Sequence, residues 1–131
     1  MRIILASKSG VRKDILNKND VDSIVVPSNV DEDQIKEALL EKGADPEMIS
    51  KNLAELKSIK VSNKHPDQLV IGADSVISLD LKLINKPSSR EEAYNILDLL
   101  NGKKHYLISS VCISKNGSMI WNYTDKSELK M

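Results

Sequence analysis

The sequence predicts an α/β fold: a mixed twisted sheet with flanking helices. Three observations predict it. Helical and strand-like segments alternate through the first part of the chain, an Asn-Gly hairpin signal lies near its end, and 131 residues suffice for one hydrophobic core. Alternating segments favour parallel strands and a hairpin is antiparallel, so the sheet should contain both kinds of pairing. We take residues 1–131 as a single domain.

The N-terminal part is predicted as strand, polar turn, helix and strand. Residues 2–6 form a short apolar run, and residues 11–19 place apolar side chains at helical spacing. Residues 23–27 make a second strand that ends at Pro27, because proline has no N–H to donate to a neighbouring strand.

Two further helices are expected before the chain returns to the sheet. Asn29 or Asp31 can cap the first of them, which Gly43 ends. Asp45, followed directly by a proline, caps the second helix, whose apolar face continues to about Val61.

The next segment is a strand with an acidic end. Residues 68–73 are mostly apolar and include Gly72, and residues 75–87 are typical of a hairpin-like return. We therefore expect the strand to end at Asp74. A buried strand end that presents a carboxylate is costly unless a cation or a reactive group meets it.

The C-terminal part is predicted as a helix and a β-hairpin. Residues 105–114 and 118–124 flank Asn116-Gly117, a pair typical of a tight hairpin turn. Ser89 and Glu92 make a capping box ahead of a helix whose buried stripe is expected to be Ala93, Ile96, Leu97 and Leu100.

Composition limits the partners. Nineteen basic residues balance nineteen acidic ones and aromatic residues make up 3% of the chain, so neither a global field nor stacking platforms favour nucleic acid. No stretch reaches the roughly 20 apolar residues of a membrane span, and the chain does not open with a signal-like segment. We expect a cytoplasmic protein with a small-molecule partner and no nucleic acid or membrane partner. Its single cysteine, Cys112, should serve packing.

Three polar clusters lie where elements begin or end, which is where functional side chains tend to be found. The first is ASKSGVRK, residues 6–13. Free backbone N–H groups at a helix start, together with Arg12 and Lys13, can hold a phosphate. Taken alone, the segment is more typical of an ordinary helix start in which Ser9 is the cap.

The second cluster combines the consecutive acids Asp31, Glu32 and Asp33 with Lys57. Acids at a helix start are usually present because they complement the helix dipole. Lys57 lies four residues after Leu53, so it projects from the edge of the buried helix face. From there it either reaches the solvent or enters a cleft.

The third cluster is Gly72, Asp74, Lys86 and Pro87. The glycine allows close backbone approach, the carboxylate can bind a divalent cation or act as a general base, and the lysine supplies charge for phosphate. An ion pair of Asp74 with Lys86 across a hairpin is equally consistent with this segment. His105 is expected to be structural, because no second histidine or cysteine lies at a metal-ligand spacing.

In order and spacing, these segments resemble the Maf family of nucleoside triphosphate pyrophosphatases. The resemblance covers nearly the whole chain and rests on LASKSGVRKDIL, VDE at 30–32, LAELKS at 53–58, VIGADSV at 70–76, NKP at 85–87, REEAYNIL and LNGKKHYLISSV. It implies a fold similar to that of inosine triphosphate pyrophosphatases, with a deep cleft. The implied reaction uses a divalent metal, Mg²⁺ or Mn²⁺, to hydrolyse the bond between the α and β phosphates, giving a nucleoside monophosphate and pyrophosphate.

The resemblance also assigns roles to residues. Asp74 matches the catalytic aspartate, as proton acceptor for the attacking water or as a metal ligand, and Glu32 matches an acid that helps hold the metal. A tetra-anionic substrate requires local positive charge. The positions that match triphosphate contacts are Ser7, Arg12, Lys57 and Lys86.

Two positions bear on the choice of base. Val11 matches a position that is apolar in members acting on 7-methyl-GTP, and Ser75 matches one that is usually threonine in members acting on dTTP and UTP and glutamine in the others. The two positions do not agree on a subgroup. We favour a modified purine triphosphate, because Val11 could pack against a base. Gly10 and Val11 also precede Arg12 where the family pattern is a proline followed by two arginines, so one basic contact is missing.

Family members continue beyond the position that matches Met131, so the chain is expected to be a partial domain lacking the C-terminal third. That loss should leave an apolar face exposed, which is either a solubility liability or the surface of a homodimer. A nucleotide-binding or interaction module without turnover is therefore the alternative to an active enzyme.

Overall fold

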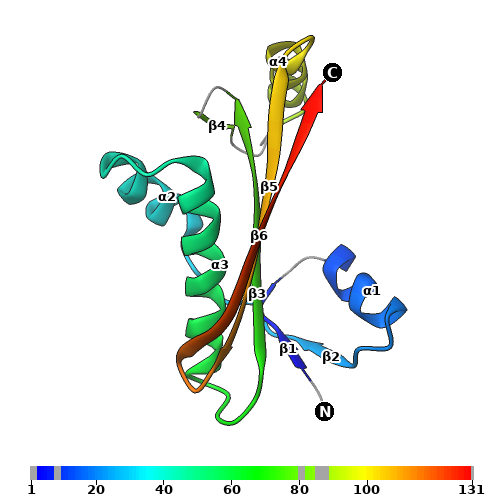
Figure 1. Cartoon of the computed structure of the whole chain (residues 1–131), viewed down its shortest axis with the longest axis vertical. Helices are drawn as coiled ribbons and strands as arrows, with labels where there is room; N and C mark the ends of the chain where they lie inside the picture. Colours follow the sequence, from blue (N-terminus) through cyan, green and yellow to red (C-terminus); the bar gives the residue numbers. More distant parts are fainter. Residues whose placement is uncertain (1–2, 8–9, 80–81, 85–88, 131) are drawn as a thin grey trace.

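A mixed sheet runs through the centre of the molecule in the strand order β2-β1-β3-β5-β6, with β4 paired to β3 (Figure 1). The structure is a computed structural model and describes residues 3–7, 10–79, 82–84 and 89–130. β1 pairs in parallel with β2 and β3, and the other pairs are antiparallel, so the predicted mixed sheet is confirmed. The strands are β1 (Ile3–Leu5), β2 (Ser23–Val25), β3 (Val70–Leu79), β4 (Lys82–Ile84), β5 (Lys104–Lys115) and β6 (Ser118–Lys130).

The described residues form four helices. Figure 1 shows α3 alongside β3 and β5, with α2 next to α3 and α1 on the other side of the sheet. Of the two candidate caps, Asp31 begins α2 by accepting a hydrogen bond from the Gln34 N–H at 3.1 Å. The helices are α1 (Gly10–Lys18), α2 (Glu32–Glu41), α3 (Pro46–Ser62) and α4 (Arg90–Leu100).

β3 is longer than predicted. Asp74 does not end the strand but pairs with Ser110 of β5, and β3 continues to Leu79. The expected strand end at Asp74 is therefore wrong, whereas the hairpin-like return is confirmed, because β3 pairs with β4 at residues 77–79. Small and polar residues around Asp74 weaken the strand pattern in the sequence, but long-range pairing with β5 supplies the missing support.

Helix α3 packs directly on β3 at Gly72. A Cβ atom at this position would lie 2.4 Å from the Ala54 carbonyl oxygen and 2.7 Å from the Ser58 nitrogen. The close approach predicted for Gly72 is thus confirmed, with the helix backbone as the partner. The adjoining core consists of Ile4, Ala6, Val61 and Val70, with Val26 packed against them.

The C-terminal hairpin has the predicted turn. Asn116 and Gly117 adopt φ values of 53° and 80°, the left-handed conformation that Asn-Gly pairs favour. The Asn116 side chain accepts a hydrogen bond from the Asp67 N–H at 2.8 Å, and the Gly117 N–H donates to Ser62 Oγ at 2.9 Å. The turn is therefore tied to the end of α3 and to the segment before β3.

Helix α4 is less buried than predicted. Ser89 caps it by accepting a hydrogen bond from the Glu92 N–H at 3.1 Å, and Leu100 is buried. Leu97, however, is 48% exposed, so the predicted buried stripe is wrong at this position. Figure 1 shows α4 at one end of the sheet, away from α3, and Tyr94 and Leu99 of this helix are also exposed.

Candidate functional site

Three charged side chains from three elements meet beside the middle of β3. The Lys57 ammonium of α3 lies 3.2 Å from Asp74 Oδ1 and forms an ion pair with Glu32 at the start of α2. It also donates to the Ala73 carbonyl oxygen at 3.2 Å. The Lys57 side chain is 10% exposed, so of the two alternatives it enters the interior instead of reaching the solvent. We name Glu32, Lys57 and Asp74 the charged cluster.

Helix and strand periodicity explain this meeting. Ala54, Lys57 and Ser58 recur on the face of α3 that packs against β3, and Asp74 points to that face because it is two residues from Gly72 on the strand. Since Gly72 has no side chain, the helix backbone can approach the strand closely. The packing at Gly72 thus sets the short separation between Lys57 and Asp74.

Asp74 carries an unmatched acceptor. Its exposed fraction is 4%, and among the described residues its Oδ2 atom is buried without a hydrogen-bond partner. Burial raises the pKa of Asp74 above its ordinary value, and the neighbouring Lys57 ammonium offsets part of that rise. Buried polar atoms are nearly always satisfied, so an orphaned carboxylate oxygen marks a position for a ligand or a transferred proton.

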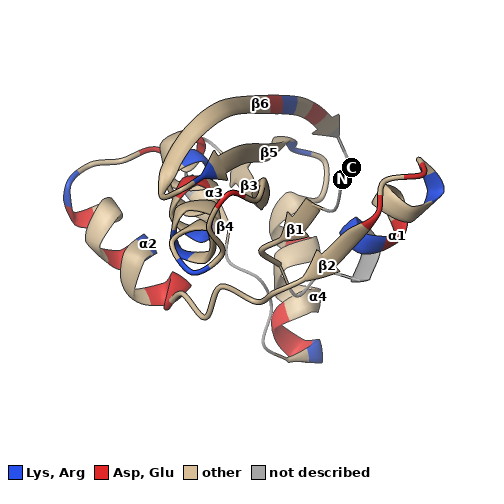
Figure 2. Cartoon of the chain, turned by 90° about the horizontal axis from the view of Figure 1, so that it is seen from below, with Lys and Arg blue, Asp and Glu red and all other residues tan. Residues whose placement is uncertain are grey.

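A second polar pair lies where β1 gives way to α1. Arg12 of α1 donates a hydrogen bond to Ser7 Oγ at 2.9 Å. Ser7 follows Ala6, whose N–H donates to the Ile71 carbonyl on β3 at 2.8 Å. Ser7 therefore lies just after the end of β1, beside the part of β3 that precedes Asp74. Figure 2 shows both signs of charge on the helices, with acidic residues where α2 begins.

The neighbouring Lys13 has a structural role. Its ammonium donates to the backbone carbonyl of Ser23 and lies 3.0 Å from the Ser23 hydroxyl. Both contacts hold α1 against β2. The two basic residues of this segment therefore differ, since Arg12 contacts the serine of the turn and Lys13 contacts the sheet.

Other predicted residues are placed differently or lie outside the described residues. Ser75 follows Asp74, so it faces the opposite side of the sheet, where its hydroxyl lies 3.0 Å from that of Ser109. The backbone of Val11 belongs to α1, but its side chain lies outside the description. The predicted residues outside the described ranges are Ser9, Lys86 and Pro87.

His105 and Cys112 have the surroundings expected of structural residues. His105 is buried, with Nδ1 3.5 Å from the Lys103 carbonyl oxygen. Cys112 is buried in β5, and burial raises the pKa of its thiol to about 11. Because the thiolate is the reactive form of cysteine, such a thiol is a poor nucleophile.

Two contributors to the site were missed in the sequence. The Ser50 hydroxyl donates to the Asp74 backbone carbonyl at 3.1 Å and lies 2.9 Å from Ser110 Oγ. Lys36 adds positive charge near Asp74 that lowers the pKa of this carboxyl. Both carried a signal in their spacing, because Ser50 precedes Lys57 by two helical turns and Lys36 follows Glu32 by one.

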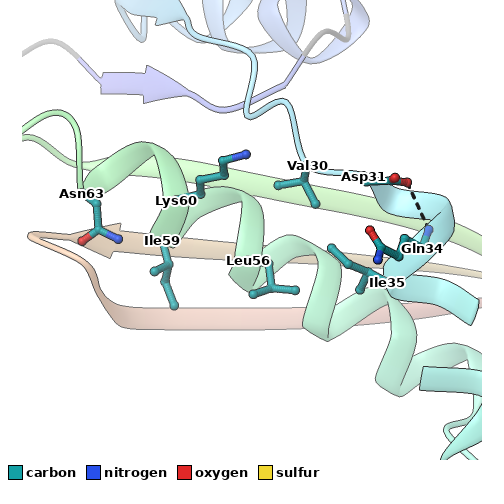
Figure 3. Close-up of a pocket in the computed structure, with 8 residues that line it drawn as sticks. All are labelled: Val30, Asp31, Gln34, Ile35, Leu56, Ile59, Lys60 and Asn63. Atoms are coloured by element: carbon teal, nitrogen blue, oxygen red, sulfur yellow. Dashed lines mark hydrogen bonds between the residues drawn. The ribbon is translucent and has the colours of Figure 1, made fainter. Parts of the chain in front are cut away.

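A separate hollow of about 430 Å³ lies between α2 and α3 (Figure 3). Neither Lys57 nor Asp74 lines it. The two helices therefore contribute to the charged cluster with one set of side chains and to this hollow with another. Its apolar walls are Val30, Ile35, Leu56 and Ile59, and its polar side chains are Asp31, Gln34, Lys60 and Asn63.

Comparison with known proteins matches residues 2–131 to the family described as Maf-like protein. The chain belongs to the Maf family. This Maf chain is 63% identical over 129 residues to the nucleoside triphosphate pyrophosphatase of Pelagibacter ubique and 34% identical over 131 residues to the 7-methyl-GTP pyrophosphatase of Brucella abortus. The alignments cover 98% and 100% of the Maf chain and 66% of each relative. The chain thus spans about two thirds of the length of these curated relatives.

Solved structures show where this Maf fold occurs elsewhere. A HAM1 protein from Coxiella burnetii aligns with a TM-score of 0.61 at 12% identity, over 98% of the Maf chain and 71% of that chain. A nucleoside-triphosphatase / dITP/XTP pyrophosphatase from Mycobacterium abscessus aligns with a TM-score of 0.59 at 14% identity. This alignment covers 98% of the Maf chain and 72% of the Mycobacterium chain. The predicted likeness to inosine triphosphate pyrophosphatases is confirmed at the level of the fold.

Proposed function

We propose that the charged cluster is the hydrolytic centre of a nucleoside triphosphate pyrophosphatase. The enzyme cleaves the bond between the α and β phosphates and releases a nucleoside monophosphate and pyrophosphate. The single observation that carries this proposal is Asp74, a buried carboxylate with one oxygen bonded to Lys57 and the other without a partner among the described residues. The name of the 63% identical relative supports the reaction class.

The donor set fits a divalent cation. Among the described residues no three or more histidine, cysteine or acidic side chains converge on one point, but Glu32 and Asp74 both reach Lys57. Mg²⁺ is commonly held by one or two carboxylates together with substrate phosphates, and two carboxylates match that pattern. Mg²⁺ or Mn²⁺, when bound, would neutralise charge on the phosphate oxygens.

The protein side chains supply the remaining chemistry. Asp74 Oδ2 can accept a proton from the attacking water, and its raised pKa brings the carboxylate closer to the range suited to a general base at neutral pH. Lys57 and Arg12 supply positive charge for the triphosphate, and Ser7 supplies a hydroxyl donor. The contact predicted for Lys86 belongs to the same proposal.

The preferred base is a modified purine. The side chain of Val11 is apolar, and a relative of 34% identity is named 7-methyl-GTP pyrophosphatase. Ser75 does not support an exclusive preference for a modified purine, because serine resembles the threonine found at this position in members acting on dTTP and UTP. A measured preference for dTTP or UTP over 7-methyl-GTP would remove this part of the proposal and leave the hydrolytic centre intact.

Product analysis tests the reaction. The purified chain should convert 7-methyl-GTP, dTTP or UTP with Mg²⁺ or Mn²⁺ into the monophosphate and pyrophosphate, as separated by ion-exchange chromatography. Asp74→Asn should lower the rate about 10²–10⁴-fold, the range for loss of a general base. The control is Asp98→Asn on the exposed surface of α4. Equal rates for Asp74→Asn and the wild type would exclude the proposal. So would release of a nucleoside diphosphate and orthophosphate, because those products come from cleavage between the β and γ phosphates.

A further inference from the structure

The charged cluster already contains a cation. Lys57 contacts Glu32, Asp74 Oδ1 and the Ala73 carbonyl oxygen, which accounts for the three N–H donors of an ammonium group. The two carboxylates that would hold a divalent cation therefore have a positive charge placed between them. The Lys57 side chain is 10% exposed, so water screens the charge of its ammonium group weakly.

We propose that Lys57 holds the place of the divalent cation until substrate arrives. A divalent cation shared by Glu32 and Asp74 must compete with the ammonium for their oxygens and is repelled by it at short range. The free protein should therefore bind the metal weakly. Metal and triphosphate should enter together, because the phosphate oxygens complete the metal coordination and offer the ammonium a new anionic partner.

The side chains at the cluster differ in how firmly they are held. The backbone of Asp74 is fixed by strand pairing on β3 and by the Ser50 hydroxyl at its carbonyl oxygen, so its short side chain starts from a fixed position. Lys57 carries its charge on a flexible four-carbon stem, so the ammonium can move to a phosphate while the helix stays in place. Asp74 Oδ2, without a partner among the described residues, is the atom that an incoming cation can take first.

This inference rests on the proposed function for the identity of the metal ligands. Its test is Mn²⁺ binding to the metal-free full chain without nucleotide, measured by titration calorimetry and by electron paramagnetic resonance of free Mn²⁺. Lys57→Met should bind Mn²⁺ at least about tenfold more tightly than the wild type, because the competing charge is gone. The matched control is Lys51→Met, an exposed lysine on the same helix, which should bind Mn²⁺ like the wild type.

A triphosphate analogue with a methylene group between the α and β phosphates supplies the second arm. With the analogue present, the wild type should bind Mn²⁺ nearly as tightly as Lys57→Met. Lys57→Gln repeats the comparison with a smaller polar side chain in case the methionine variant does not unfold cooperatively. Lys57→Arg, which keeps the charge, should bind Mn²⁺ as weakly as the wild type.

The outcomes separate the two proposals. If Lys57→Met and Lys57→Gln bind Mn²⁺ no more tightly than the wild type, while Asp74→Asn abolishes Mn²⁺ binding with the analogue, the place-holding role is refuted and the metal site stands. If Asp74→Asn changes neither Mn²⁺ binding with the analogue nor pyrophosphate release, the proposed function itself is refuted.

Discussion

The hydroxyl of Ser50 on α3 donates a hydrogen bond to the backbone carbonyl of Asp74 on β3, at 3.1 Å. Ser110 and Thr124 continue this contact as a line of hydroxyl groups across β5 to β6, with separations of 2.9 and 3.1 Å. Asp74 is thus held through its backbone as well as through Lys57. Helix α3 and strands β3, β5 and β6 are thus joined by polar contacts, and Ser50 and Ser110 are themselves buried.

Ser50→Ala should destabilise the fold. The change removes the donor to the Asp74 carbonyl and a partner of Ser110 in a fully buried position, and such a loss costs about 1–3 kcal/mol. Urea unfolding followed by circular dichroism measures it. Ser127→Ala, at an exposed position on β6, is the control and should change the free energy of unfolding by less than about 0.5 kcal/mol. Equal stability of both variants would contradict a role for Ser50 in anchoring Asp74.

Gly72→Ala should separate α3 from β3. The new methyl group would meet helix backbone atoms at 2.4 and 2.7 Å, and these cannot give way as a side chain would. We expect a loss of about 1–3 kcal/mol in the free energy of unfolding, measured in urea, because overpacking shifts the backbone. Gly43→Asn is the control, because Gly43 has φ 82° and open space around it, and asparagine tolerates that conformation. Unchanged stability of Gly72→Ala would show that the helix can move away without cost.

Asp74→Asn should change how stability depends on pH. Since folding raises the pKa of Asp74, the folded state binds its proton more tightly than the unfolded state does. The resulting stabilisation is complete below the ordinary pKa of 3.8 and is lost as the pH rises through the raised pKa. Asparagine does not titrate, so the melting temperature of the variant relative to the wild type should increase with pH above 3.8 and then level off.

Thermal unfolding between pH 4 and pH 8 provides this measurement, with Asp98→Asn as the variant that removes an exposed charge. A relative melting temperature that is constant with pH, or that falls as the pH rises, would contradict a raised pKa at Asp74. The reading is independent of catalysis, because it requires neither nucleotide nor metal.

The sheet face opposite α3 should promote self-association. Trp121 and Tyr123 stack there with ring centroids 6.2 Å apart and are 50% and 57% exposed. Large exposed apolar patches are commonly interaction surfaces. Replacing both residues by threonine keeps side chains that suit a strand. The average molar mass measured by sedimentation should then rise less with protein concentration than it does for the wild type. Leu40→Gln removes an exposed apolar side chain from α2 and should leave self-association unchanged. A wild type that stays monomeric throughout would refute the homodimer, which is one of the two alternatives that the sequence left open for an exposed apolar face.

Local signals in the sequence were sufficient for most element boundaries. Asp31, Ser89 and Asn116 make backbone or turn interactions within a few residues, and their roles follow from that local chemistry. The continuation of β3 past Asp74 was not accessible in this way, because it depends on pairing with β5, which lies more than thirty positions away. The predicted burial of the α4 stripe was wrong at Leu97 for a related reason. An apolar stripe indicates a contact face, but it does not indicate that a partner covers that face.

The site shows the same division. The charge at Lys57 and the carboxylate at Asp74 were identifiable, and so was the small residue at Gly72. Their convergence was not, because it requires knowing that α3 crosses β3 at this glycine. The serine contacts were missed for a chemical reason: the helical spacing places Ser50 on the same face as Lys57, but it does not identify the partner of a buried hydroxyl group on another element.

Asp74 lies within nine consecutive residue pairs between β3 and β5, and β1 borders the beginning of the same strand. A carboxylate mounted there keeps its position when the turns at the rim of the sheet are rebuilt. For the proposed pyrophosphatase, substrate choice and bond cleavage could consequently evolve on different parts of the molecule: residues in the rim turns could be exchanged to admit another base, while the proposed reactive group stays in the firmest part of the scaffold.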